Sequence, residues 1–439
     1  MTATALNAGT DLPSVRPMPR GLWGCWALLC VLTLLNANSV AALAGAPERL
    51  FNPMLLAMAL VVVAMTAREV RKISRPPIPA VFVFMAVFLL VGTFAATRGI
   101  AVPIDQAVGH IPGYLAAGLI VVAGAFMAMG AVEADQVDLL LKTMFWPLVL
   151  ASLSGVLFIA VPAIGDYLTL LPGARLHGVF GNVNELGGQA GYALVVGLVL
   201  SMRSGRRRWV AIGLVAALIG AISSASKSAM LGLLPLVGLL GYAASGARVR
   251  WRPVVGLLVA SGVALAGGFW IARQLLEGRF GIDLSTDWVE RLGAVMDVIS
   301  SGTLDETTTT GRTGIWLAGI RNWSASPIVG LGISAFDRVA GVDMEIHSTA
   351  LRILGEAGLA GMFAFVMMAV SLLLAAIRSP RRDVHVLGIG FVLVQLPGIL
   401  TSGGMLLERN QNIVSGCVVG LLAGVWSRTR PGSRQKRAS

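Results

Sequence analysis

The chain has 439 residues, of which 56% are hydrophobic and 13% are charged, and its formal net charge is +12. Ordinary soluble domains are about one quarter charged, so this composition cannot cover a folded chain of this length with polar surface. It excludes a soluble enzyme, a disordered chain and a secreted disulfide scaffold, and it leaves a polytopic membrane protein.

Twelve apolar segments are long enough to cross a hydrocarbon core about 30 Å thick, which takes roughly 20 helical residues. Such segments must be helices, because an open sheet edge finds no hydrogen-bond partner in lipid. We therefore predict an all-α polytopic membrane protein with about 12 transmembrane helices. In chain order the predicted spans are residues 21–45, 50–67, 78–97, 111–131, 139–163, 185–202, 209–225, 228–245, 253–272, 348–377, 384–402 and 410–427.

The distribution of charge predicts the orientation of these helices. An even number of spans puts both termini on one side. Together with Lys142 at a helix end, the segments on that side carry 22 of the 34 Lys and Arg residues but only 6 of the 22 acidic residues. Positive charge marks the cytoplasmic side, so both termini are predicted to be cytoplasmic. The net charge is thus interpreted as a topology signal, and no nucleic-acid partner is predicted.

The first apolar run is too long for a cleavable signal peptide.

One segment on the opposite face is much longer than the others. Residues 273–346 separate the ninth and tenth predicted spans, and loops of that length usually fold and carry function. Within it, residues 286–300 have the apolar stripe of an amphipathic helix. The predicted units are therefore the first nine helices, a helical periplasmic loop domain, the last three helices and a basic cytoplasmic tail, at residues 1–272, 273–346, 347–427 and 428–439.

Three residues in and beside this loop suit phosphate and proton chemistry. Arg312 follows Gly311 at a predicted helix start, where unpaired backbone N–H groups and the helix dipole favour an anion. Its guanidinium can grip a phosphate through two parallel hydrogen bonds, and Arg338 follows in the same loop. His347 stands just before the tenth span, and an imidazole can accept a proton near neutral pH.

A second tier of candidates lies at other loops of the same face. Arg175, His177 and Asn184 lie at the start of the sixth span, and Lys227 lies in the hairpin between the seventh and eighth spans. Plainer interpretations stay open for all of these residues. The arginines could pair with neighbouring acids, Lys227 could extend to the membrane surface, and His347 could bond a backbone carbonyl.

Asp343 and Glu345 could hold a divalent metal, but two carboxylates alone favour a solvated acidic turn. Neither a metal nor another cofactor is predicted.

Two further patterns predict packing. Arg352 and Glu356 have the i, i+4 spacing of a structural ion pair. Glycines 416, 420 and 424 form a small-residue face that suits close helix packing, either within the bundle or across a homodimer.

Several of these motifs occur in one order along the chain. They are Gly181-Asn182-Val183-Asn184, Ser224-Ala225-Ser226-Lys227-Ser228, Gly311-Arg312, Trp316, Pro327, Gly330-Leu331-Gly332, His347 and Leu354-Gly355-Glu356-Ala357-Gly358. This ordered set resembles the O-antigen ligase and polymerase superfamily, over roughly residues 175–361. Many members have His-Asn where this chain has His347-Ser348, so the resemblance assigns no role to Ser348.

The resemblance implies a glycosyltransferase of the bacterial inner membrane, active at the periplasmic face and independent of metal and nucleotide. It implies a glycan on undecaprenyl pyrophosphate as donor. A ligase passes that glycan to lipid A–core, a polymerase passes it to another repeat unit, and a related branch passes it to protein serine or threonine. The single large outer loop favours the ligase.

For an inverting transfer, the residues suggest three roles. His347 is the candidate base for the acceptor hydroxyl, and Arg312 and Arg338 are the candidates that stabilise the departing pyrophosphate. Lys227, Arg175, Asn184 and His177 are candidate substrate-binding residues.

A secondary transporter is the alternative from another class, because twelve spans suit it. Transporters, however, place polar sites near the midplane in two repeated halves. The chain shows no such duplication, and its charged groups cluster at one face, which favours the enzyme.

Overall fold

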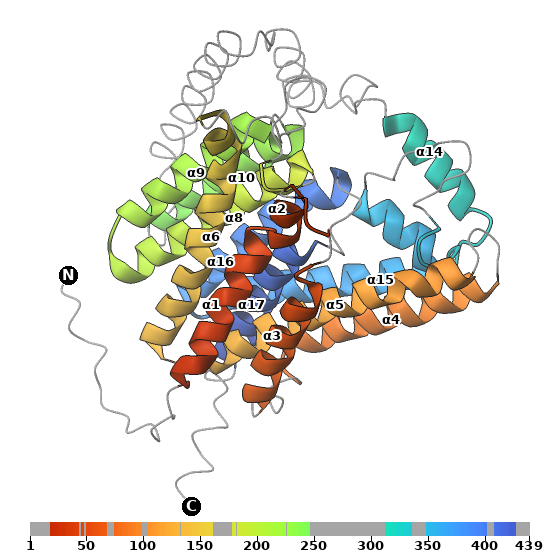
Figure 1. The fold of residues 1–439 in the computed structure, drawn as a ribbon, viewed down its shortest axis with the longest axis horizontal. Coiled ribbons are helices and arrows are strands. Elements are labelled where there is room, and N and C mark those ends of the chain that lie inside the picture. The colour runs from red at the N-terminus through yellow and green to blue at the C-terminus, as the bar shows by residue number, and fades with distance from the viewer. Residues whose placement is uncertain are drawn as a thin grey trace, which may run out of the picture.

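The computed structural model describes residues 18–43, 45–47, 50–67, 74–98, 104–131, 133–160, 178–180, 182–224, 226–245, 312–335, 348–401 and 408–426. These residues form helices joined by turns, with no strand among them (Figure 1). The helices are α1 (Arg20–Leu34), α2 (Ala37–Leu43), α3 (Asn52–Met65), α4 (Ile78–Thr97), α5 (Ile104–Gly130), α6 (Ala134–Ala160), α8 (Val183–Ser204), α9 (Arg208–Ser224), α10 (Lys227–Ser245), α14 (Arg312–Trp323), α15 (Thr349–Ile377), α16 (Arg382–Thr401) and α17 (Arg409–Trp426).

The all-α prediction is confirmed for the described ranges. Six helices there are long and apolar enough to cross a membrane, and three shorter apolar helices accompany them. The total of twelve spans stays a prediction. The ninth predicted span (253–272), the amphipathic helix (286–300) and most of the long loop lie outside the described residues. The six are Ile78–Thr97, Ala107–Gly130, Ala134–Ser154, Val183–Ser204, Thr349–Ile377 and Arg382–Ile399.

The first predicted span is not one helix. α1 ends at Leu34, and after a two-residue break α2 starts at Ala37. At the break, Asn36 has a φ of 48°, and its Nδ2 donates to Ser39 Oγ at 2.7 Å. Asparagine tolerates this left-handed conformation because its short polar side chain bonds locally. The prediction of one continuous helix over 21–45 was wrong because the apolar run continues through the break.

Helix α8 lies at the centre of the bundle and packs against α6, α9, α10 and α16. Most of its length is buried, and small residues bring neighbouring backbones close to it. A Cβ on Gly197 would lie 2.6 Å from the Trp209 carbonyl oxygen, and one on Gly213 would lie 2.7 Å from that of Ala193. The α8–α9 pair thus uses glycine for close approach, as membrane helices commonly do. This packing fixes the start of α8, where Asn184 lies.

Helices α5 and α17 run side by side, and the glycine face of α17 lies between them. A Cβ on Gly416 would lie 2.2 Å from the Val121 carbonyl oxygen, and one on Gly420 would lie 2.2 Å from that of Ala125. These glycines therefore pack within the bundle, which decides between the two alternatives left open by the sequence. They supply no face for a second copy of the chain.

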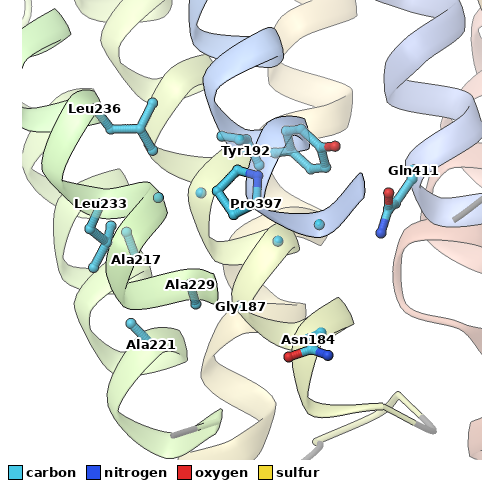
Figure 2. A pocket seen from close by; sticks show the side chains of 15 residues that line it. Asn184, Gly187, Tyr192, Ala217, Ala221, Ala229, Leu233, Leu236, Pro397 and Gln411 are labelled. Atoms are coloured by element: carbon cyan, nitrogen blue, oxygen red, sulfur yellow. The ribbon is translucent and has the colours of Figure 1, made fainter. Parts of the chain in front are cut away.

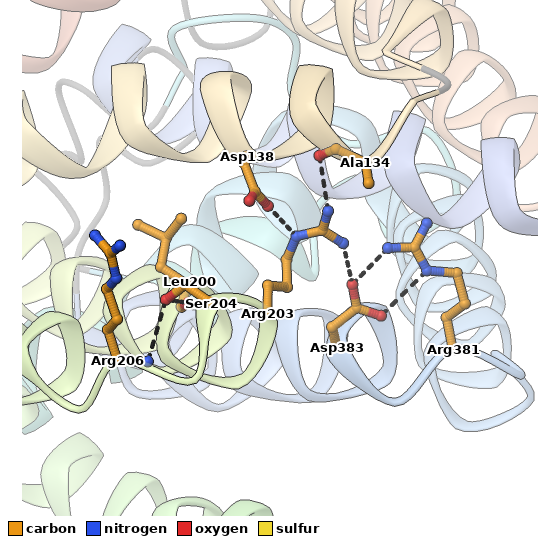
Figure 3. Close-up of polar contacts among 8 residues, drawn as sticks. All are labelled: Ala134, Asp138, Leu200, Arg203, Ser204, Arg206, Arg381 and Asp383. Carbon is orange, nitrogen blue, oxygen red and sulfur yellow. Dashed lines mark hydrogen bonds and ion pairs between the residues drawn. The ribbon is translucent and has the colours of Figure 1, made fainter. Parts of the chain in front are cut away.

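One end of the bundle, here called the Arg203 end, is held by charged groups (Figure 3). Arg203, at the end of α8, forms ion pairs with Asp138 of α6 and, at 2.6 Å, with Asp383 of α16. Arg381 bonds the same Asp383 carboxylate at 2.5 Å. Exposed arginines at positions 206–208 lie at this end too. The opposite end, where α8, α10, α15 and α17 begin, is here called the Asn184 end.

We expect Gly416→Ala to destabilise the protein, because the added methyl group meets backbone atoms that cannot move aside. Overpacking of this kind typically costs about 1–3 kcal/mol. The thermal unfolding temperature of the purified protein in detergent measures the effect. Gly424→Ala is the matched control, since its Cβ would lie 3.8 Å from the nearest atom, an ordinary contact. Equal unfolding temperatures for the two variants would contradict the assigned packing.

Candidate functional site

Two of the sequence motifs meet where α8 and α10 begin. Asn182 caps α8, its Oδ1 accepting from the Asn184 backbone N–H at 2.8 Å. Ser226 caps α10 by accepting from the Ala229 N–H at 3.4 Å. The buried Ser226 hydroxyl then donates to Asn184 Oδ1 at 2.7 Å. This bond joins the Gly181–Asn184 and Ser224–Ser228 motifs, which are about forty residues apart in the sequence.

The junction places two of the predicted substrate-binding residues near each other along the backbone. Asn184 lies in the first turn of α8, and Lys227 is the first residue of α10. The Lys227 side chain, and Arg175 and His177 altogether, lie outside the described residues. The sequence analysis included Ser226 in a motif but did not predict its role as a cap, although a serine directly before an apolar helix is a recognisable cap signal.

The second pair of motifs meets at a break in α15. Gly358 has φ 64° and ψ −159° within this helix, so the helical hydrogen bonds are interrupted there. The connector between α14 and α15, residues 326–335, lies against the break and supplies the missing partners. Four backbone hydrogen bonds result: Leu331 N–H to Gly355 O at 2.7 Å, Gly332 N–H to Glu356 O at 3.1 Å, Leu359 N–H to Pro327 O at 2.9 Å and Ala360 N–H to Ile328 O at 3.1 Å.

The motif glycines make this docking possible. Gly330, Gly332 and Gly358 all have positive φ angles, which side chains with a Cβ rarely adopt. A Cβ on Gly330 would lie 2.6 Å from the Gly358 nitrogen, and one on Gly358 would lie 2.3 Å from the Ile328 carbonyl oxygen. The Gly-Leu-Gly and Gly-Glu-Ala-Gly motifs are therefore two halves of one backbone junction.

Helix α4 holds the other side of the connector. The Ile333 N–H donates to the Gly92 carbonyl at 3.1 Å, and Arg98 Nη1 donates to Ser326 Oγ at 2.9 Å. Within the connector, Trp323 Nε1 donates to the Pro327 carbonyl at 3.0 Å. The end of α14 is thus fixed against both α4 and α15.

A buried ionic group lies directly beside the junction. Arg352 Nε bonds Glu356 Oε1 at 3.0 Å, with the two side chains 4% and 0% exposed. The Tyr114 hydroxyl of α5 donates to the other carboxylate oxygen at 3.1 Å. The predicted structural ion pair is confirmed. The tyrosine that completes it comes from a distant part of the chain and has no sequence signal.

Of the three main catalytic candidates, only Arg312 belongs to the described residues. Arg312 is the first residue of α14, as predicted, although its side chain lies outside the described part of the chain. Ser348 caps α15, its buried Oγ accepting from the Leu351 N–H at 3.3 Å, and His347 directly precedes it in the sequence. His347 and Arg338 lie outside the described residues, and their catalytic roles stay predictions. The sequence analysis left Ser348 without a role, and the structure assigns it the cap.

Three cavities border the starts of α8, α15 and α17. A largely apolar cavity of about 240 Å³ lies between α4, α5, α15, α16 and α17, with Thr349, Gln411 and Asn412 among its lining residues. A narrow one of about 30 Å³ is lined by Asn184 and Gln411 (Figure 2). A polar one of about 320 Å³ is lined by residues of α1, α2, α3, α8 and α17. Gln411 lines the first two, and its Nε2 donates to Glu408, which lines the third.

Among the described residues, no group of three or more His, Cys, Asp and Glu side chains could hold a metal ion. Asp343 and Glu345, the pair considered as a metal site, lie outside them.

Residues 212–366 match the sequence model of the O-antigen ligase family. This segment is similar to that family and is called here the O-antigen ligase domain. The resemblance inferred from the motifs is confirmed over this segment, which includes the α10 cap, the connector and the break in α15. No curated protein shows a significant sequence match to the chain. Residues 212–366 are thus similar to the O-antigen ligase family, and the apolar helices of the described residues are long enough to cross a membrane.

Glu356→Gln should destabilise the O-antigen ligase domain markedly. The change removes the carboxylate that pairs with the buried Arg352 cation, and breaking a buried ion pair typically costs about 3–5 kcal/mol. Tyr114→Phe, which removes one hydrogen bond and retains the pair, should cost about 1.5–3 kcal/mol. Thermal unfolding of both variants in detergent tests this order. A Glu356→Gln protein as stable as wild type would show that the pair contributes nothing.

Proposed function

We propose that this protein is an O-antigen ligase that works as an inverting glycosyltransferase. In this proposal it transfers a glycan from undecaprenyl pyrophosphate to a hydroxyl group of lipid A–core, at the periplasmic face of the bacterial inner membrane. The match over residues 212–366 supports the enzyme class. The choice of a ligase over a polymerase is part of the proposal, and so is the identity of both substrates.

The docking of the 326–335 connector into α15 is the observation that carries the proposal. It fixes the end of the helix that begins at Arg312 against the helix whose cap follows His347. A cation and a base must keep a constant separation to act on one substrate, because small displacements lose much of the rate. Hydrogen bonds on both sides of the connector fix the backbone between these two helices, which supports the proposal.

The proposed reaction is one displacement at the anomeric carbon. The acceptor hydroxyl loses its proton to His347 and attacks, while the bond to the pyrophosphate oxygen breaks with inversion. The leaving pyrophosphate takes the bonding electrons, and Arg312 and Arg338 stabilise its negative charge. Fixed cations in a partly dehydrated site act much more strongly than in water. Lys227, Arg175, Asn184 and His177 are proposed to bind substrate.

Two further observations support this assignment. The Asn184–Ser226 bond brings the start of α10, with Lys227, to the end of the bundle where α15 also begins. The apolar cavity of about 240 Å³ extends from Thr349 along α15 between aromatic side chains such as Phe84 and Phe88, and suits an isoprenoid chain.

The proposed orientation follows from charge. Arg203, Arg381 and the exposed arginines of residues 206–208 gather at the Arg203 end, which we assign to the cytoplasm by the positive-inside rule. The Asn184 end is then periplasmic, and the predicted cytoplasmic termini follow.

Deletion of the gene, followed by gel analysis of lipopolysaccharide, tests the function. A ligase predicts loss of the whole ladder with full core retained. Core carrying a single repeat would instead indicate a polymerase, and unchanged lipopolysaccharide with altered glycoproteins would indicate the protein-modifying branch. Movement of substrate in vesicles without bond cleavage would indicate the secondary transporter.

His347→Ala should reduce glycan transfer by roughly 10²–10⁴-fold, the usual contribution of a general base, while folding and donor binding persist. The assay uses purified protein with a lipid-linked donor and lipid A–core. His385→Ala is the control, because His385 lies at the Arg203 end, where its Nδ1 is 2.9 Å from the Ala376 carbonyl oxygen. Near-normal transfer by the His347 variant would remove it as the base.

Arg312→Lys should also fail in transfer, because lysine keeps the charge but loses the two-pronged grip on a phosphate. The transfer assay with a lipid-linked donor and lipid A–core measures the activity of this variant. Arg321→Lys is the matched control, since Arg321 is exposed in the last turn of the same helix. Full activity of the Arg312 variant would refute bidentate binding of the pyrophosphate.

A further inference from the structure

The arginines at the Arg203 end fall into two groups. Arg203 and Arg381 form ion pairs with Asp383 (Figure 3), and Arg382 donates to two backbone carbonyls at the end of α10. These three arginines hold helices together. The exposed arginines at positions 206–208 form no ion pair with any residue that the structure describes. The charge of this second group is therefore available to a partner outside the bundle.

Two tryptophans lie beside one of these exposed arginines. Arg208 and Trp209 begin α9, and the Arg208 Cζ atom lies 5.2 Å from the centroid of the Trp209 ring. The Trp209 ring meets Trp146 of α6 edge to face, with 5.9 Å between the ring centroids. Such cation–π and aromatic contacts hold the guanidinium in one orientation.

A second cation shares the face of α6 that carries Trp146. Lys142 precedes Trp146 by four residues, so the two side chains lie one turn apart on one side of the helix. Lys142 is also three residues from Phe145, whose ring contacts Trp209, which places it on the side of α6 that faces α9. It is partly exposed and forms no ion pair within the described part of the chain. We call Lys142, Trp146, Arg208 and Trp209 the Trp146 cluster.

Toward the middle of the bundle, the outer faces of both helices are apolar. Leu150 follows Trp146 by one turn of α6 and is 48% exposed, and Val215 lies two turns after Arg208 on α9 and is 54% exposed. Trp146 itself is 47% exposed. In a membrane such aliphatic side chains contact acyl chains, whereas tryptophan is typical of the headgroup level. The Trp146 cluster therefore presents positive charge at headgroup depth, next to two acyl-chain contacts.

These properties select an anionic phospholipid as the ligand. Its phosphate complements the charges of Lys142 and Arg208, while a zwitterionic headgroup also carries a cation that both side chains repel. A free phosphate leaves the exposed apolar side chains without a contact. Only a lipid with a negatively charged headgroup matches both parts of the surface.

Nearby acidic groups do not cancel this attraction. Asp138 lies one turn before Lys142, but Arg203 already pairs with it. The exposed Glu133 and Asp135 precede Lys142 by seven residues or more, which is roughly 10 Å along a helix. That distance is about one Debye length at physiological salt, so these two carboxylates oppose a bound anion only weakly.

We propose that the Trp146 cluster binds an anionic diacyl phospholipid. Its phosphate lies between Lys142 and Arg208, and its acyl chains follow Leu150 and Val215. The inference goes beyond glycan transfer, because it requires only that α6 and α9 lie in a membrane. A lipid held by both helices stabilises the bundle, since a ligand that binds only the folded protein shifts unfolding to higher temperature.

Native mass spectrometry of the full-length protein in detergent tests the site. The probes are dioleoyl phosphatidylglycerol, dioleoyl phosphatidylcholine and glycerol 3-phosphate. We expect phosphatidylglycerol to bind wild type at least about tenfold more tightly than phosphatidylcholine, because two cations contribute roughly fivefold each. It should also raise the thermal unfolding temperature. Equal affinities for the two lipids would overturn the proposal, as would glycerol 3-phosphate binding as tightly as phosphatidylglycerol, which indicates a site for free phosphate.

Lys142→Gln and Arg208→Gln should each weaken phosphatidylglycerol binding roughly fivefold and leave phosphatidylcholine binding unchanged. Arg208→Lys keeps the charge and should keep most of the affinity, so a folding defect in Arg208→Gln is recognised by comparison. Arg378→Gln is the matched control, because Arg378 is exposed at the same end but caps α15, which packs against α4, α14, α16 and α17. Unchanged affinity in both the Lys142→Gln and Arg208→Gln variants would refute the site, and so would an equal loss in Arg378→Gln.

Discussion

The need to satisfy backbone hydrogen bonds in an apolar bundle shapes the O-antigen ligase domain. A break in a membrane helix exposes amides and carbonyls that lipid cannot satisfy. At Gly358 the connector from α14 supplies those partners from its own backbone. The break and the connector therefore satisfy each other's backbone groups. This arrangement fixes the end of α14 against α15.

The same constraint explains the buried ion pair beside the break. Arg352 and Glu356 lie on the turn of α15 that the connector contacts, and the carbonyl of Glu356 accepts one of the connector's hydrogen bonds. An ion pair in this position costs desolvation and contributes little net stability. We interpret its role as positional, because the tyrosine from α5 bonds the same carboxylate and so ties a third helix to the junction.

Periodicity and composition predicted most helices to within a few residues, because a continuous apolar run can only be a helix in lipid. The errors have physical causes. The 21–45 run is apolar on average, yet the helix breaks at Asn36, because one residue in a left-handed conformation interrupts a helix with little change in mean hydropathy. α5 and α6 begin earlier than predicted because polar residues extend helices beyond the membrane. Asn184 and Arg312 were placed at helix starts, but their bonding partners could not be foreseen.

The sequence alone determined that the chain is a helical membrane protein, which motifs it carries and which superfamily they resemble. These follow from local properties, namely hydrophobicity, residue type and spacing. Only the tertiary structure decided that Gly330 meets Gly358, that Ser226 bonds Asn184 and that the α17 glycines pack on α5. It alone showed that Trp146 of α6 meets Trp209 of α9. Such contacts join residues far apart in the chain, and no local pattern encodes which helix will be the neighbour.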